Sequence, residues 1–162
     1  MNPLNQLTPS VRYPLVFQKI LKWATSRSQS IAQRGAWLTP EATKLALKLG
    51  VKEPDKIRIY SAHDAMDIGD EALSRLLKKF GFSTSRTCGI TLFHSIAMNP
   101  YCNSNLVVLA HELRHVAQFE ACGSLEFYLN YYLMEVGYFG YGKGPLEVDA
   151  QLASTNNNNN NF

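Results

Sequence analysis

The chain has 162 residues, of which 46% are hydrophobic, 18% charged and 11% aromatic, and its formal net charge is +3. This length suits one domain with a real hydrophobic core. No apolar run reaches about 18 residues, which excludes a transmembrane helix from the expected elements. Near the N-terminus, Lys19 and Lys22 interrupt the only apolar candidate, so we expect no signal peptide.

Positive charge is concentrated in the first part of the chain. Up to Ser104 there are 14 Lys and Arg against 7 Asp and Glu, whereas from Asn105 onward there are 2 against 6. A basic region can mark a nucleic-acid surface. However, the lysines and arginines between residues 19 and 34 are more typical of the solvated face of a helix, so no nucleic-acid partner is expected.

Hydrophobic periodicity predicts three helices in the first half of the chain. Residues 13–35 form an amphipathic pattern. A second helix starts with Thr39 as N-cap and Pro40 in the first turn, and it ends at Gly50. The third covers about residues 70–80.

Two segments alternate between apolar and polar residues and are predicted to be strands, residues 56–61 and residues 89–98. In the second strand one face would carry Ile90, Leu92, His94 and Ile96. A small sheet is therefore expected ahead of the next helix.

The last part of the chain is predicted to contain two more helices. Residues 124–136 are rich in Leu, Phe and Tyr, and Pro145 opens a short final helix over residues 146–153. Residues 154–162 are nearly all Asn and are expected to form a disordered tail. The remainder, residues 1–153, is expected to be a single domain.

The three cysteines, Cys88, Cys102 and Cys122, are an odd number at irregular spacing. They fit neither a disulfide framework nor a cysteine zinc site, so buried free thiols are expected. Free thiols in turn suggest a reducing, cytoplasmic setting.

The clearest motif is HExxH, formed by His111, Glu112 and His115 within a predicted helix, residues 106–122, that Gly123 follows. On a helix the two histidines stand one turn apart, about 40° from each other around the axis. Their ring nitrogens can therefore converge on one ion, and Zn²⁺ binds neutral imidazole. Glu112 lies about 100° round from His111, which suits a general base acting on a metal-bound water.

A plainer interpretation is that the two histidines lie on the surface of an ordinary helix. Against it, the polar residues of the motif interrupt an otherwise apolar run from Leu106 to Ala117. A mostly apolar helix is usually buried, and buried polar groups need partners or a metal ion. We therefore favour a metal site.

A catalytic zinc site needs a third protein ligand. Upstream, His94 lies within the predicted second strand, where a hydrogen-bonded structural role is favoured, and no histidine follows His115. The third ligand should therefore be a carboxylate. The candidates are Glu120, Glu126, Glu135, Glu147 and Asp149. Glu120 shares the helix with the histidines and is disfavoured by geometry, whereas Glu135 and Glu147 lie on later helices that could reach the site.

Two segments, HELRHVAQ (111–118) and PLEVDA (145–150), resemble the gluzincin class of zinc metallopeptidases, and more narrowly small bacterial HExxH domains of largely unassigned role. In those families a Glu in an E-x-x-A context completes the site, and Glu147 matches it. The resemblance implies zinc as cofactor, ligands His111, His115 and Glu147, Glu112 as base, and an α+β, mainly helical zincin-like domain with a small sheet before the motif helix.

One position departs from the family pattern. Many gluzincins place an Asp four residues after the ligand Glu, where it orients a ligand histidine, but here that residue is Gln151. Its amide oxygen could accept an imidazole N–H, although without the charge.

The expected activity is zinc-dependent hydrolysis of peptide bonds in a peptide or protein substrate. By the same resemblance, the predicted strand 89–98 could hold an extended peptide by edge pairing. Candidate donors to the developing oxyanion are Tyr138, Tyr141 and His94. The alternatives are a catalytically inactive, zinc-stabilised protein-binding domain and an adaptor that binds DNA or a membrane surface through the basic first part.

Overall fold

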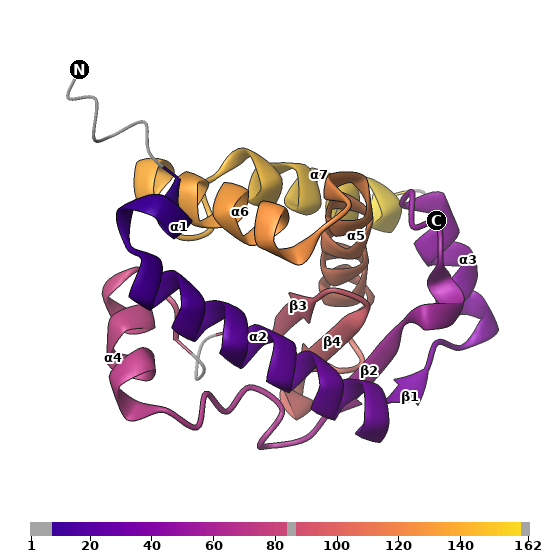
Figure 1. The fold of residues 1–162 in the computed structure, drawn as a ribbon. Coiled ribbons are helices and arrows are strands. Elements are labelled where there is room, and N and C mark those ends of the chain that lie inside the picture. The colour runs from indigo at the N-terminus through magenta and orange to yellow at the C-terminus, as the bar shows by residue number, and fades with distance from the viewer. Residues whose placement is uncertain (1–7, 84–86, 160–162) are drawn as a thin grey trace.

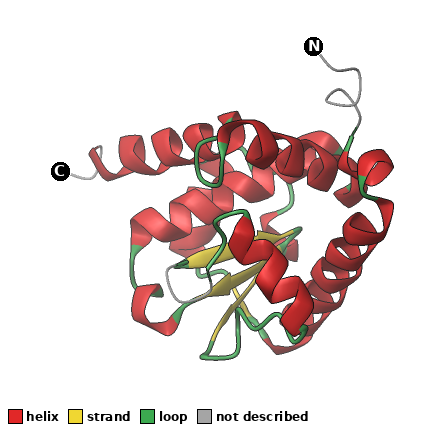
Figure 2. Ribbon diagram, turned by 90° about the vertical axis from the view of Figure 1, so that its left-hand side faces the viewer, coloured by secondary structure: helices red, strands yellow, loops and turns green. Residues whose placement is uncertain are grey.

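The computed structural model describes residues 8–83 and 87–159 of the chain. Within these ranges the fold is α+β and mainly helical, as expected, with seven α-helices and a four-stranded mixed sheet (Figures 1 and 2). The helices are α1 Pro9–Arg12, α2 Pro14–Arg34, α3 Pro40–Lys48, α4 Glu71–Lys79, α5 Leu106–Cys122, α6 Leu125–Phe139 and α7 Pro145–Asn159. The strands are β1 Ala36–Trp37, β2 Arg58–Ser61, β3 Gly89–Leu92 and β4 Ser95–Met98, with short 3₁₀ turns at Pro54–Lys56 (η2) and Pro100–Cys102 (η3).

The sheet has the order β1-β2-β4-β3, so β3 is an edge strand among the described residues. Strands β2 and β4 run parallel, and the other two pairs are antiparallel. Ile96 of β4 packs in one core cluster with Leu113 of α5, whereas Ala97 packs with Ile31 of α2. Because neighbouring residues of a strand point to opposite faces, the sheet lies between α5 on one side and α2 on the other.

The expectation of one long strand over residues 89–98 is wrong, because the segment folds back on itself as a hairpin. Leu92 pairs with Ser95, and Phe93 turns the chain with a positive φ of 61°. That conformation is uncommon for a non-glycine residue, so the sequence carries no ordinary turn signal here. Ile96 consequently shares a face with its partner Thr91 rather than with Leu92.

Most predicted helices are confirmed, together with the predicted N-cap Thr39. Thr39 accepts a hydrogen bond from the amide of Ala42, and Asn105 accepts from the first turn of α5. Gly123 ends α5 in the left-handed conformation, with φ 78°. Helix α6 extends three residues beyond its expected end at residue 136.

The predicted end of the last helix at residue 153 is wrong, because α7 continues to Asn159. Ser154 is buried, and its hydroxyl donates to the backbone oxygen of Gln151. Residues 160–162 of the expected tail lie outside the described residues, as do residues 1–7 of the expected domain.

The expectation of three free thiols is also wrong. Cys88 and Cys102 form a disulfide with a Cα–Cα distance of 5.6 Å, while Cys122 is free and half-buried. The hairpin explains the pairing, because it brings Gly89 opposite Met98 and so places the two flanking segments side by side. With two of the three cysteines in a disulfide, the cysteines no longer favour a reducing compartment.

No helix in the described part of the chain combines the length and the apolar character needed to cross a bilayer.

Candidate metal centre

The HExxH residues and the candidate third ligand lie on two helices that pack along each other. His111, Glu112 and His115 belong to α5, and Glu147 belongs to the first turns of α7 (Figure 1). Pro145 begins α7, where its fixed φ suits the first helical position. The structure therefore brings together the four residues that the sequence suggested for one site.

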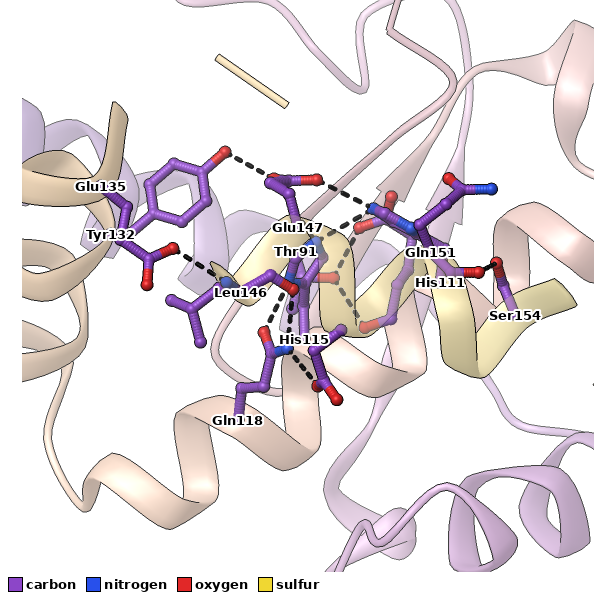
Figure 3. A network of polar contacts seen from close by, with 12 residues as sticks. Thr91, His111, His115, Gln118, Tyr132, Glu135, Leu146, Glu147, Gln151 and Ser154 are labelled. Atoms are coloured by element: carbon purple, nitrogen blue, oxygen red, sulfur yellow. Dashed lines mark hydrogen bonds and ion pairs between the residues drawn. The ribbon is translucent and has the colours of Figure 1, made fainter. Parts of the chain in front are cut away.

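The donor atoms of His111, His115 and Glu147 form a compact cluster. The two Nε2 atoms are 3.1 Å apart. The Oε2 atom of Glu147 is 3.3 Å from His111 Nε2, and its Oε1 atom is 3.6 Å from His115 Nε2. Ligand atoms at about 2.0–2.1 Å from a tetrahedral zinc ion lie about 3.3–3.4 Å from one another. The donor set and its spacing therefore fit three corners of a zinc site (Figure 3).

The ring of His115 is oriented by Gln118, which lies one turn further along α5. His115 Nδ1 lies 2.8 Å from the amide oxygen of Gln118. The amide nitrogen of Gln118 donates to the backbone oxygen of Leu146 at 2.9 Å and to Asp149 at 2.7 Å. These two acceptors turn the amide oxygen toward the imidazole, so Nδ1 is the protonated nitrogen. The lone pair of Nε2 is then free for a metal ion.

Asp149 is in turn held by Arg114 of α5. The guanidinium donates twice to the carboxylate, at 2.7 and 3.2 Å, and once to the backbone oxygen of Leu49 at 2.8 Å. Hydrogen bonds from Arg114 are the main reason that the pKa of Asp149 lies below its usual value. The suggestion that Gln151 orients a ligand histidine is wrong, because Gln151 is exposed and Gln118 takes that role.

Glu147 lies between the two imidazoles and Tyr132 (Figure 3). The Tyr132 hydroxyl donates to Oε1 at 2.7 Å. Burial raises the pKa of Glu147, but its contacts with the imidazoles of His111 and His115 outweigh this effect and hold the pKa well below the usual range. Glu147 is therefore an anion placed between two nitrogen donors, as a metal ligand requires.

Glu112 is only 5% exposed and lies against the edge strand. The hydroxyl of Thr91 is 2.7 Å from its Oε2 atom and 3.0 Å from its backbone oxygen. A Cβ at Gly89 would lie 2.5 Å from its Oε1 atom, so only glycine leaves room for the carboxylate there. Burial raises the pKa of Glu112, and the neighbouring His115 and His111 partly offset this. A raised pKa suits a group that must take up a proton.

The other carboxylate candidates have different roles. Glu135 is buried on α6 and accepts the amide hydrogen of Leu146 at 2.9 Å, so it caps the start of α7. Glu126 is exposed. Glu120 lies near the far end of α5, where its carboxylate accepts from the amide of Glu53 at 3.1 Å and pairs with His94 Nε2 at 2.8 Å.

The centre opens into a cavity of about 490 Å³ that His111, Glu112, His115 and Glu147 all line. Tyr138 and Tyr141, two of the suggested oxyanion donors, also line it. Burial raises the pKa of Tyr141 to about 12, so its hydroxyl keeps the proton that a donor needs. The third suggestion, His94, instead faces Glu120.

Sequence reasoning missed the residues that support the site, namely Thr91, Gln118 and Tyr132, and it considered Asp149 only as a ligand. Gln118 could have been found, since a residue three positions after His115 shares its helix face. The others act across elements whose packing has no local signal.

No model of a known protein family matches the chain, and no curated protein or solved structure does either.

Proposed function

We propose that this chain is a zinc metallopeptidase of gluzincin type, with His111, His115 and Glu147 as ligands and Glu112 as general base. The observation that carries the proposal is the close approach of the two imidazole Nε2 atoms, 3.1 Å apart, to the Glu147 carboxylate, at 3.3 and 3.6 Å, beside a second, buried carboxylate. Structural zinc sites are closed by four protein ligands, whereas catalytic sites use three and leave one position for water or substrate. Here three donors border a cavity, which favours catalysis.

A zinc ion held by these residues would polarise the scissile carbonyl and lower the pKa of a bound water. Glu112 would accept the proton of the attacking water and deliver it to the leaving amine, a role worth about 10²–10⁴ in rate. Thr91 holds the carboxylate in place for both transfers. Tyr141 is the favoured donor to the developing oxyanion, because it is half-buried, lines the same cavity and stays protonated.

The edge strand β3 supplies a second element of substrate binding. It borders the cavity, and its residue Thr91 contacts Glu112 directly. An extended peptide could add to such an edge by main-chain hydrogen bonds, with one side chain in the cavity and the next pointing away. The substrate is accordingly a peptide or an unfolded segment of a protein.

The proposal is tested by measuring zinc content and peptide cleavage for the wild type and for Glu112→Gln. Both proteins should bind one zinc ion, and the variant should lose at least about 100-fold in cleavage rate. Glu126→Gln is the matched control, because Glu126 is an exposed glutamate on the next helix. Activity should disappear with a chelator and return with Zn²⁺. Bound zinc without turnover in the wild type would instead indicate a zinc-stabilised protein-binding domain.

A further inference from the structure

The cavity of the metal centre reaches the surface where the ends of three helices meet. Its exposed lining residues include Tyr13 between α1 and α2, Phe80 after α4 and Tyr138 in the last turn of α6. Helices α1 and α4 lie at the same end of the molecule, where α1 packs against α6 (Figure 1). The rings of Phe82 and Tyr141 meet with their centroids 5.9 Å apart, which joins the segment after α4 to the segment after α6. The opening is therefore bordered by aromatic residues from separate parts of the chain.

The corner between α1 and α2, at this opening, carries apolar side chains that are directed to water. Leu15 is 81% exposed, Val11 61% and Tyr13 52%. Single exposed apolar residues are ordinary, but apolar residues that gather on a surface mark a site of interaction. Together with Phe80 and Tyr138, the corner forms such a surface at the end of the cavity.

Positive charge surrounds the same opening. The segments that meet there, residues 8–40, 72–83 and 136–146, contain five, three and one Lys or Arg and no Asp or Glu, although the chain has 13 acidic residues. Lys78 and Lys79, in the last turn of α4, are exposed, and neither forms an ion pair with another described residue. The apolar side chains therefore stand in a basic surrounding, which favours an anionic partner.

We propose that this end of the molecule, the opening face, binds the surface of a lipid bilayer that contains anionic lipids. The opening face comprises Val11, Tyr13, Leu15, Lys78, Lys79, Phe80 and Tyr138. Its aliphatic side chains would enter the boundary between headgroups and acyl chains. Its tyrosines suit the headgroup level, and its lysines would attract the anionic headgroups.

The aliphatic side chains favour a bilayer over a nucleic acid as the anionic partner. Single-stranded nucleic acids are bound by aromatic rings that stack on bases and by cations that contact phosphates. Leu15 and Val11, the most exposed residues of the corner, can do neither. Glu126, the exposed acid of α6, lies in the first turn of that helix, whereas Tyr138 lies in the last, so it does not interrupt the opening face.

The first test is co-sedimentation of the wild-type protein with vesicles. Vesicles of phosphatidylcholine with about 30% phosphatidylglycerol should bind it at least about 10-fold more tightly than vesicles of phosphatidylcholine alone, and added salt should weaken the binding. Failure to bind either kind of vesicle would overturn the proposal, and so would equal binding to both. Binding of a single-stranded DNA oligonucleotide without binding of vesicles would assign the opening face to a nucleic acid.

The second test removes charge from the opening face. Replacing Lys78 and Lys79 with glutamine should weaken binding to the anionic vesicles by at least about 10-fold, since each basic residue near such a surface contributes about fivefold. The control replaces Lys44 and Lys48 with glutamine. Both are exposed on α3, at the opposite end of the molecule (Figure 1). An equal loss in the two double variants would contradict the proposal, because binding would then depend on net charge alone.

The third test asks whether the corner enters the bilayer. Leu15→Trp places a fluorescent side chain at the corner, and Leu47→Trp places one on α3, where Leu47 is also exposed. With brominated lipids in the anionic vesicles, the emission that Leu15→Trp adds should be quenched and the emission that Leu47→Trp adds should not. Equal quenching, or no quenching of either, would overturn the proposed orientation of the opening face.

This inference goes beyond the proposed peptidase function and does not depend on it. Vesicle binding should be the same for the wild type, for protein treated with a chelator and for Glu147→Gln, because the opening face contains no proposed zinc ligand. Vesicle binding by a protein that cleaves no peptide would retain the membrane proposal and overturn the peptidase. Cleavage by a protein that binds no vesicles would do the reverse.

Discussion

Gln118 and His115, one turn apart on α5, meet through the amide oxygen and Nδ1 at 2.8 Å. Since the amide nitrogen is committed to Leu146 and Asp149, the contact fixes both the tautomer and the plane of the imidazole. A metal-ligating histidine commonly depends on such a partner. Helix α7 thus helps the centre twice, by carrying Glu147 and by holding the residue that orients His115.

This relationship predicts that Gln118→Met lowers zinc affinity by about 10- to 100-fold, because methionine keeps the volume but offers no amide oxygen. Competition with a fluorescent zinc chelator measures the affinity. Gln151→Met is the control, since Gln151 is exposed, and it should leave the affinity unchanged. A larger loss in Gln151→Met than in Gln118→Met would contradict the assignment.

With Glu147 as the third ligand, replacing Glu147 should lower zinc affinity, whereas replacing Glu135 should not. Glu147→Gln should lower zinc affinity by more than about 100-fold, because it removes the anionic donor itself. Glu135→Gln should bind zinc normally, because a glutamine oxygen can still accept the amide hydrogen of Leu146. Calorimetric titration of both variants distinguishes them, and the reverse pattern would make Glu135 the ligand.

Because the Thr91 hydroxyl contacts the carboxylate of Glu112, removing that hydroxyl should lower the rate of peptide cleavage without lowering the zinc content. Thr91→Val keeps the shape of the side chain and removes the hydroxyl, so we expect kcat/KM to fall about 10-fold, equivalent to about 1.4 kcal/mol. Thr91→Ser keeps the hydroxyl and should retain most of the activity. If valine and serine behaved alike, the hydroxyl would have no part in placing the base.

The disulfide predicts a specific count of reactive thiols. Unfolded without reductant, the protein should react with one equivalent of an alkylating reagent at Cys122, and after reduction with three, as read by mass spectrometry. Replacing Cys88 and Cys102 with serine should lower the free energy of unfolding by about 3 kcal/mol, the value expected for a closed loop of about 15 residues. Three reactive thiols before reduction would disprove the bond.

The parts of the fold that could be predicted from sequence depend on short-range physics. The cap at Thr39 and the helix over residues 106–122, which Gly123 ends, depend on neighbouring residues alone, and the structure confirms them. The hairpin was missed because Phe93 adopts a positive φ, and no glycine or asparagine at the turn indicates that conformation in the sequence. The disulfide was missed for the same reason, because only the reversal of the chain brings Cys88 to Cys102.

Within the site, the histidines and Glu112 followed from helical spacing alone. Glu147 was reached through resemblance to a family pattern rather than through geometry, because its distance from His115 depends on how α7 packs against α5. The role of Asp149 likewise depends on how α7 packs against α5 and could not be predicted from the sequence. Its partners, Arg114 and Gln118, are more than 30 positions earlier in the chain, and no local pattern connects them.

Helix α5 has a second face, on which Leu113 and Val116 are completely buried in the main core cluster. The imidazoles therefore project from a segment that tertiary packing already immobilises. Unlike a zinc finger, whose fold depends on its metal, this protein should keep its shape without the zinc ion that we propose. The proposed ligands would then be held in place before zinc binds, so removal and rebinding of zinc should be reversible.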